Sequence, residues 1–127
     1  MAIPSGSGTE VLRRGSINDL EAQATHFDFS GAAETTANQT TNVVPAHHII
    51  TIISIIFYGK ENVTNGIDLK LKNGTNYIQI LEHTLPYEDT FIFSDKIVLH
   101  PGDALQVTPA SNHDVDIWYS YIDQDWS

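Results

Sequence analysis

Apolar and polar residues alternate along most of this chain, as they do in strands that bury one face. The clearest alternation runs from residue 66 to residue 72, where Ile67, Leu69 and Leu71 alternate with Asp68, Lys70 and Lys72. The same period of two predicts further strands at Thr9–Arg14, near His26–Phe29, and at Asn76–Glu82, Thr90–Ser94, Ala104–Thr108 and Val115–Ile122. In the last strand, one face carries Val115, Ile117, Tyr119 and Tyr121, and the other carries Asp114, Asp116, Trp118 and Ser120. Asn18–Thr25 begins with helix-capping residues and predicts a single short turn of helix.

Turn residues separate these segments and indicate antiparallel connections. Lys72–Thr75 has Asn-Gly at its centre, which predicts a two-residue hairpin turn of type I′. Asn65–Gly66 and Pro101–Asp103 are turn signals of the same kind, and the small, polar segment Gly31–Asn42 predicts a long loop. About eight short strands at this spacing predict an all-β fold, an antiparallel β-sandwich whose expected form is a jelly roll.

The segment His48–Tyr58 is apolar on both faces of a strand. In strict alternation, one face carries Ile49, Thr51, Ile53, Ile55 and Phe57, and the other carries Ile50, Ile52, Ser54, Ile56 and Tyr58. An antiparallel sandwich strand normally has one polar face, and an exposed apolar strand favours aggregation. We therefore expect the second face to be covered, either by the N-terminal segment of the same chain or by another subunit, with the subunit favoured.

The length of 127 residues suits one domain and is too short for two cores. We expect an extended arm over residues 1–12, because Met1–Gly8 contains Pro4 and a Ser-Gly repeat, and a single β-sandwich domain over residues 13–127. Met1–Gly8 lacks the basic and apolar regions of a secretory signal, and His48–Tyr58 is too short to cross a membrane as a helix. We therefore expect a soluble chain.

The composition is strongly acidic, because sixteen Asp and Glu residues against six Lys and Arg residues give a net charge of −10. Proteins that bind nucleic acid need a basic surface for the phosphates, and anionic lipid surfaces have the same requirement. The charge therefore predicts that the chain binds neither. Cysteine is absent, which excludes disulfides, thiolate metal sites and cysteine nucleophiles.

Histidines and acidic pairs are the candidate metal and acid–base groups. Leu99–Asp103 resembles a turn of the cupin metalloenzymes, but the chain lacks the two histidines one residue apart, followed by a glutamate, that cupins place before it. Asp114 and Asp116 share a strand face and could bind Ca²⁺ or act as an acid–base couple, although a solvated strand edge is the favoured interpretation. Nucleophile-elbow, phosphate-loop and dinucleotide-binding motifs are missing. We expect no enzyme activity, no catalytic residue, no metal and no cofactor in the monomer; the axis of an oligomer could still gather one histidine from each chain.

Aromatic residues crowd the C-terminus, where Trp118, Tyr119, Tyr121 and Trp126 lie within a few residues of one another. Trp118 shares its strand face with aspartates, and two interpretations stay open for it: a core or subunit contact, which is favoured, or a platform for stacking on sugar rings. Trp126 lies beyond the last predicted strand and therefore needs a surface on which to dock.

Longer motifs stand at both ends and in the middle of the chain. It opens with Ile3-Pro-Ser-Gly-Ser-Gly-Thr-Glu-Val-Leu12 and closes with Trp118-Tyr-Ser-Tyr-Ile-Asp-Gln-Asp-Trp126; between them lie His48-Ile-Ile-Thr-Ile-Ile-Ser-Ile55 and Thr90-Phe-Ile-Phe-Ser-Asp-Lys-Ile-Val-Leu99. This order resembles a group of small virion structural proteins of tailed bacteriophages, notably phages of marine and cyanobacterial hosts. The resemblance covers nearly the whole chain except Gly31–Asn42, and it implies a β-sandwich component of the capsid or tail surface without catalytic residues.

From this resemblance we expect a capsid decoration (cement) protein, a homotrimer that binds the outer surface of a phage head. Its expected partners are the major capsid protein or other virion proteins, and its expected location is the virion. A neck, tail or fibre-base component and a carbohydrate-binding module are the alternatives. The residues expected to make shell or subunit contacts are Ile3, Pro4, Val11, Leu12, Ile50, Ile52, Ile56, Trp118 and Trp126.

Overall fold

The computed structural model describes residues 9–20, 24–31, 41–60, 65–109 and 115–126. The strands in these ranges are β1 (Thr9–Leu20), β2 (Thr25–His26), β3 (His48–Gly59), β4 (Asn65–Asn73), β5 (Asn76–Leu85), β6 (Thr90–Phe93), β7 (Ile97–Leu99), β8 (Ala104–Pro109) and β9 (Val115–Asp125). No helix in the described part of the chain is long and apolar enough to cross a membrane.

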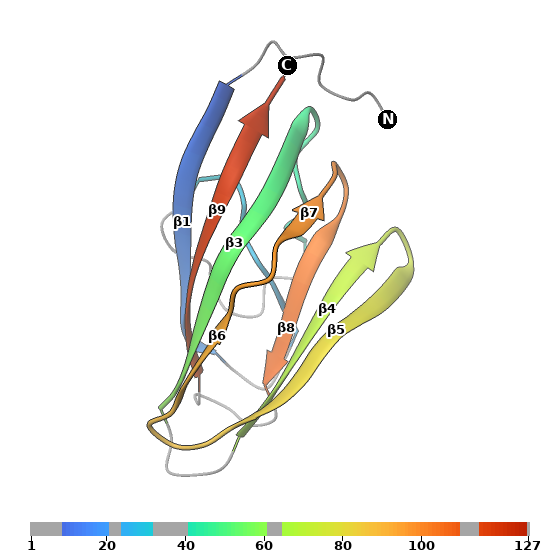
Figure 1. The fold of residues 1–127 in the computed structure, drawn as a ribbon. Helices are drawn as coiled ribbons and strands as arrows, with labels where there is room; N and C mark the ends of the chain where they lie inside the picture. The colour runs from blue at the N-terminus through green and yellow to red at the C-terminus, as the bar shows by residue number, and fades with distance from the viewer. Residues whose placement is uncertain (1–8, 21–23, 32–40, 61–64, 110–114, 127) are drawn as a thin grey trace.

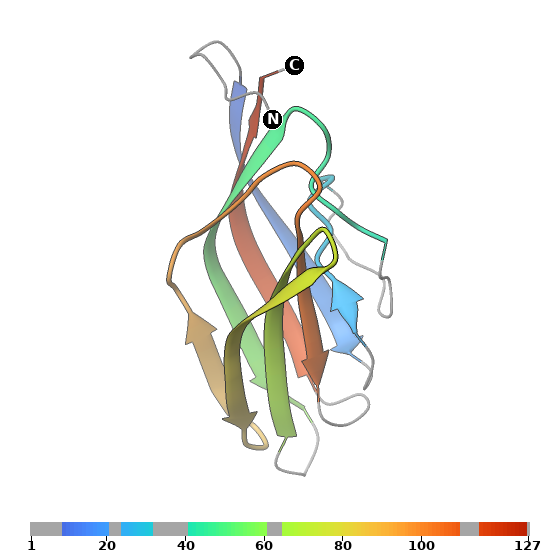
Figure 2. The ribbon, with the colours of Figure 1, turned by 90° about the vertical axis from the view of Figure 1, so that its right-hand side faces the viewer.

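The strands form two antiparallel sheets. In one sheet the order is β1-β9-β3-β6, with β7 also paired to β3, and in the other it is β2-β8-β4-β5. The first sheet lies on one side of the molecule in Figure 1, and after a quarter turn β4, β5 and β8 lie in front of it (Figure 2). Because β6 and β7 pair with successive parts of β3, they act as one interrupted strand. This order is that of an eight-stranded jelly roll, which confirms the predicted all-β sandwich.

The core lies between the sheets and is rich in aromatic side chains. Tyr119 and Tyr121 of β9 are fully buried, as the alternation predicts. Phe27 meets Tyr119 edge to face at 4.8 Å between ring centroids, and Phe29 meets Tyr121 in the same way at 5.1 Å. Such pairs add about 0.5–1.5 kcal/mol each beyond the area they bury. The chain around Phe27 and Phe29 was expected to be a strand, yet β2 ends at His26. Beyond it the Phe27 amide still donates a hydrogen bond to the Leu105 carbonyl at 2.9 Å, and the two rings hold the segment against the core.

A bulge in β3 changes which of its residues face the core. The pairing of β3 with β9 shifts register between Ile52 and Ser54. Before the shift Ile50 and Ile52 are buried, and after it Ile55 and Phe57 are buried. An extra residue in one strand exchanges the two faces, so strict alternation over the whole of β3 was wrong. Ile50 and Ile52 belong to the monomer core and cannot make the expected subunit contact.

The N-terminal part of the fold also differs from the prediction. Thr9–Leu12 were assigned both to a strand and to the arm; the strand is confirmed and the arm is not, because these residues belong to β1, where Thr9 pairs with Asp125. The helical turn expected at Asn18–Thr25 is contradicted at both ends, because β1 continues to Leu20 and β2 starts at Thr25; residues 21–23 lie outside the described ranges. Long backbone pairing with β9 overrides the local capping signal. Residues 1–8 lie outside the described ranges, so an arm there stays a prediction.

The hairpin between β4 and β5 forms where Asn-Gly predicted it, but one residue later. Asn73 pairs with Asn76, which leaves Gly74 and Thr75 as the two turn residues. Gly74 has a φ of 62°, whereas Thr75 is not among the residues with positive φ. This pattern is that of a type II′ turn, which requires glycine at its first central position. The strand β7 was not predicted, and residues 32–40 of the expected long loop lie outside the described ranges.

Candidate interaction surface

Two largely apolar rows cross the outer face of the five-stranded sheet from edge to edge. Cross-strand pairing aligns Ser16, Trp118, Ile56 and Ile92 in one row, and Leu12, Ile122, Thr51 and Val98 in the other. Five of the large side chains are well exposed: 70% for Leu12, 57% for Ile92, 54% for Val98, 45% for Trp118 and 39% for Tyr58. We call this surface the Trp118 face; it consists of Leu12, Ile53, Ile56, Tyr58, Ile92, Val98, Trp118 and Ile122. The outer face of β3 is thus apolar, as the sequence predicted, although different residues form it.

Trp118 stands between two shallow hollows. One hollow, of about 300 Å³, lies towards Tyr58 and is lined by Ser16, Ile56 and Asp116 among others. The second, of about 480 Å³, lies towards Leu12 and is lined by Ile53, Ser54 and Ser120 among others. A projecting indole beside two concave patches is a surface on which another protein's side chains can pack.

Charges on this face are few and balanced. Of the charged side chains described on these strands, Glu10, Arg14 and Asp116 have the outward positions, and Lys60 at the end of β3 lies 3.4 Å from the carboxylate of Asp116. The Arg14 guanidinium lies 4.7 Å from the centre of the Trp118 ring, within cation–π range. Two positive and two negative groups sum to zero, on a chain of net charge −10. Depletion of charge is typical of the central part of a protein interface.

The other residues expected at contacts lie elsewhere. Val11 is exposed and pairs with Asp123 at one end of the sandwich. Trp126 docks on its own chain: its ring meets that of His47 edge to face at 6.0 Å, and its amide donates to the His47 carbonyl at 3.1 Å. Ile3 and Pro4 lie outside the described residues. The structure therefore brings together three members of the predicted set, Leu12, Ile56 and Trp118.

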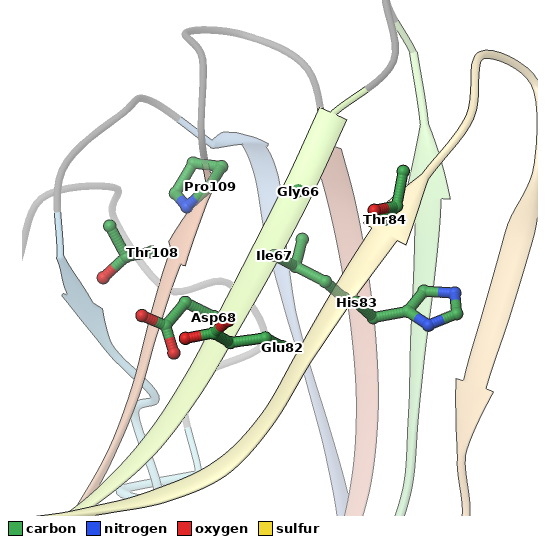
Figure 3. Close-up of a pocket in the computed structure, with 8 residues that line it drawn as sticks. All are labelled: Gly66, Ile67, Asp68, Glu82, His83, Thr84, Thr108 and Pro109. Atoms are coloured by element: carbon green, nitrogen blue, oxygen red, sulfur yellow. The ribbon is translucent and has the colours of Figure 1, made fainter.

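The four-stranded sheet carries a hollow of about 520 Å³ at its outer side (Figure 3). Asp68 and Glu82 are paired across β4 and β5, and their carboxylates point to the same side in Figure 3. His83 points away from them and stacks on Phe91, with 3.9 Å between ring centroids. Asp68 accepts a hydrogen bond from the Gln79 amide and lies 3.6 Å from the Lys70 amine. These partners make the hollow a solvated, ion-paired strand surface.

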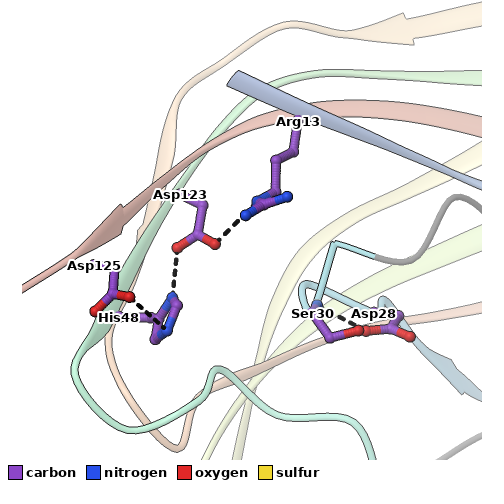
Figure 4. A network of polar contacts seen from close by, with 6 residues as sticks. All are labelled: Arg13, Asp28, Ser30, His48, Asp123 and Asp125. Carbon is purple, nitrogen blue, oxygen red and sulfur yellow. Dashed lines mark hydrogen bonds and ion pairs between the residues drawn. The ribbon is translucent and has the colours of Figure 1, made fainter. Parts of the chain in front are cut away.

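A polar network closes one end of the sandwich (Figure 4). The nearly buried carboxylate of Asp123 lies 3.2 Å from Arg13 Nε and 2.6 Å from His48 Nδ1. His48 Nε2 lies 3.7 Å from Asp125. Beside this network, burial raises the pKa of the Tyr121 phenol, while the Gly31 backbone and the Arg13 guanidinium act in the opposite direction. The network binds β1, β3 and β9 together.

The histidines that the structure describes have structural neighbours. His26 is buried, and its ring nitrogens lie 3.1 Å from the Asn42 carbonyl and 3.2 Å from Gln106 Oε1. The cupin-like turn is closed by Asp103, which accepts a hydrogen bond at 2.9 Å from the His100 amide. Within the described ranges, no three His, Asp or Glu side chains gather as a metal site requires. His113 and Asp114 lie outside those ranges, so the Asp114–Asp116 pair is not described.

The sequence matches no protein-family model and no curated protein. Among solved structures, the chain is similar to the Eiger TNF of S. frugiperda, at 11% sequence identity over 91% of this chain and 92% of that chain, with a TM-score of 0.39. At this identity the likeness concerns the fold alone. The strand order and the Trp118 face therefore describe a jelly-roll β-sandwich with a candidate protein-interaction surface.

Proposed function

We propose that this chain is a virion structural protein of a tailed bacteriophage, a capsid decoration (cement) protein that stabilises the head by protein–protein contacts. The observation that carries the proposal is the Trp118 face, an apolar and nearly uncharged surface on an acidic chain. The largest apolar patch on a soluble protein is often the site at which it contacts another protein. The motifs at the two ends and in the middle of the chain support the assignment to a phage virion.

The mechanism in this proposal is burial of surface, with no chemical step, no cofactor and no catalytic residue. Apolar area removed from water stabilises a contact by about 25 cal/mol per Å², and repetition over a shell multiplies a modest contact. The acidic remainder of the surface keeps the subunit soluble and away from the packaged genome. The proposed partners are the major capsid protein and further copies of this chain as a homotrimer.

A neck, tail or fibre-base position is the alternative within the virion, and it needs the same interaction surface. A carbohydrate-binding module is a second candidate, favoured by the 45% exposure of Trp118 beside a hollow that Asp116 helps to line. Indole rings stack on sugars, but Arg14 already lies over this ring. Glycan-array binding that is lost in Trp118→Ala would favour the module over the structural protein.

The test of the proposed function is the copy number of this protein in purified virions, measured by quantitative mass spectrometry. A copy number close to that of the major capsid protein is expected for a cement protein. A value matching a single tail or neck ring would favour the alternative position. Absence from purified particles would refute a virion role.

Deletion of residues 2–8 tests the predicted arm separately. We expect this variant to keep the folded domain, measured by circular dichroism, and to lose binding to heads that lack the protein. Unchanged binding would contradict the arm and leave the Trp118 face as the shell contact.

A further inference from the structure

We infer that a second copy of this chain docks on the Trp118 face, in a closed ring where the β1 side of this face on one copy packs against its β6–β7 side on the next. This inference deepens the proposed function and rests on it for the need for a repeated subunit. It concerns the purified protein alone, so it can be tested without a virion.

The exposed apolar area is large enough for such a contact. The five well-exposed side chains of the Trp118 face leave roughly 500 Å² open to solvent, taking about 200 Å² for a large side chain. A stable contact buries about 800 Å² on each partner. The apolar side chains thus supply more than half of the area of one standard interface. The polar residues around them on the same face can supply the rest.

The apolar rows reach both edges of the sheet. Leu12 on β1 is at one end of its row and Val98 on β7 is at the other. Ile92 on β6 ends the second row in the same way. These residues are among the most exposed apolar side chains, so the apolar surface extends to the β6–β7 edge without a polar rim between. A neighbouring copy placed at the same level would meet the β6–β7 ends of both rows with the β1 ends of its own.

The charges on the two edges differ. The exposed charged residues described on β1 are Glu10 and Arg14, which cancel, because Arg13 is bound to Asp123 of its own chain. The stretch from Glu88 to Lys96, which forms the opposite edge, has three exposed acidic residues and one exposed lysine. Two copies of the acidic β6–β7 edge would repel each other, so this edge pairs more favourably with the β1 edge of a second copy. This favours a head-to-tail ring over a two-fold dimer, because two-fold pairing places like edges together.

Register places one pair of opposite charges at the same level. Arg14 pairs with Ser120, and Ser120 pairs with Ser54 on β3. Ile55 of β3 pairs with Phe93 of β6. The segment that lies beside Ser54 therefore falls between Phe93 and the start of β7 at Ile97. Asp95 lies in that interval and is exposed, as is Arg14. In a ring whose axis runs along the strands, Arg14 of one copy faces Asp95 of the next.

The experiment measures the mass of the purified chain by sedimentation equilibrium over a range of concentrations. We expect a trimer for the wild type. Arg14→Asp and Asp95→Arg should each weaken assembly by at least about tenfold, because each places like charges in contact. The double variant, which exchanges the two charges, should restore assembly. Glu82→Lys, an exposed charge reversal on the other sheet, is the matched control and should leave assembly unchanged.

Trp118→Ala tests the face itself and should give a monomer with an unchanged circular-dichroism spectrum. If Trp118→Ala unfolds, Ile92→Asp at an exposed edge position replaces it, and this variant should also be a folded monomer. A monomeric wild type, a dimer, or charge variants that fail to restore each other would overturn the inference. A trimer restored by the charge exchange, from a protein absent from virions, would uphold this contact and refute only the proposed function.

Discussion

Replacing Gly15 by alanine should destabilise the fold through a clash with Tyr119. Gly15 lies opposite Tyr119 in the ladder of β1 and β9. The tyrosine ring covers the glycine, so an added Cβ would overlap the ring and lie only 2.8 Å from Cε2. The ring has little freedom to move away, because it is fully buried and its hydroxyl donates a hydrogen bond of 2.7 Å to the Asp28 carbonyl.

The expected cost follows from these contacts. Overpacking a close-packed core by one methyl group costs about 1–3 kcal/mol, and a displaced Tyr119 also gives up a hydrogen bond worth about 1 kcal/mol. We therefore expect Gly15→Ala to lower the free energy of unfolding by about 2–4 kcal/mol, a large part of the stability of a small domain.

Urea unfolding followed by intrinsic fluorescence measures this loss. Gly74→Ala is the matched control, because nothing lies within 4 Å of its added Cβ and only the φ of 62° opposes it; about 1 kcal/mol is expected. Tyr119→Leu makes room for the methyl group, so adding Gly15→Ala to it should cost less than about 1 kcal/mol. A Gly15→Ala variant as stable as the wild type, or costs that simply add in the double variant, would refute the steric argument.

The remaining predictions concern the polar end of the sandwich and its surface. Asp123→Asn removes the carboxylate that joins Arg13 and His48, and thermal unfolding should show a loss of about 2–4 kcal/mol; an unchanged transition would contradict a role in stability. Burial raises the pKa of Tyr121 above 10.0, so the phenol ionises first in the unfolded state and stability falls as the pH rises above 10.0. Tyr121→Phe should reduce that alkaline loss and change stability at neutral pH by less than about 1 kcal/mol, which unfolding curves at several pH values check. Lys72→Glu, on the sheet remote from the Trp118 face, should leave the oligomer mass unchanged and alter stability by about 0.5 kcal/mol or less.

Much of the fold could be predicted from local patterns. The run around Leu69 and the run around Ile117 each alternate without interruption, and both were placed correctly as strands with the expected inner face. The Asn-Gly signal found the β4–β5 hairpin, because glycine adopts a positive φ without the steric cost that other residues bear. Period-two alternation and turn signals depend only on residues a few positions apart, so they can be recognised in a single sequence. The sequence alone thus determined an all-β sandwich with an apolar, unusual third strand.

Pairing between distant strands decided the rest. The bulge near Ile52 depends on the register of β3 against β9, which lies more than sixty residues further along the chain, and no local pattern marks it. The same register decides that Ile50 is core while Ile56 is on the surface, and it sets Trp118 between Ser16 and Ile56. In a strand that is apolar on both faces, such as β3, alternation does not show which face is inside, and only the tertiary contacts decide it. The Trp118 face therefore exists only in the folded chain, because five strands from both ends and the middle of the sequence must meet to form it.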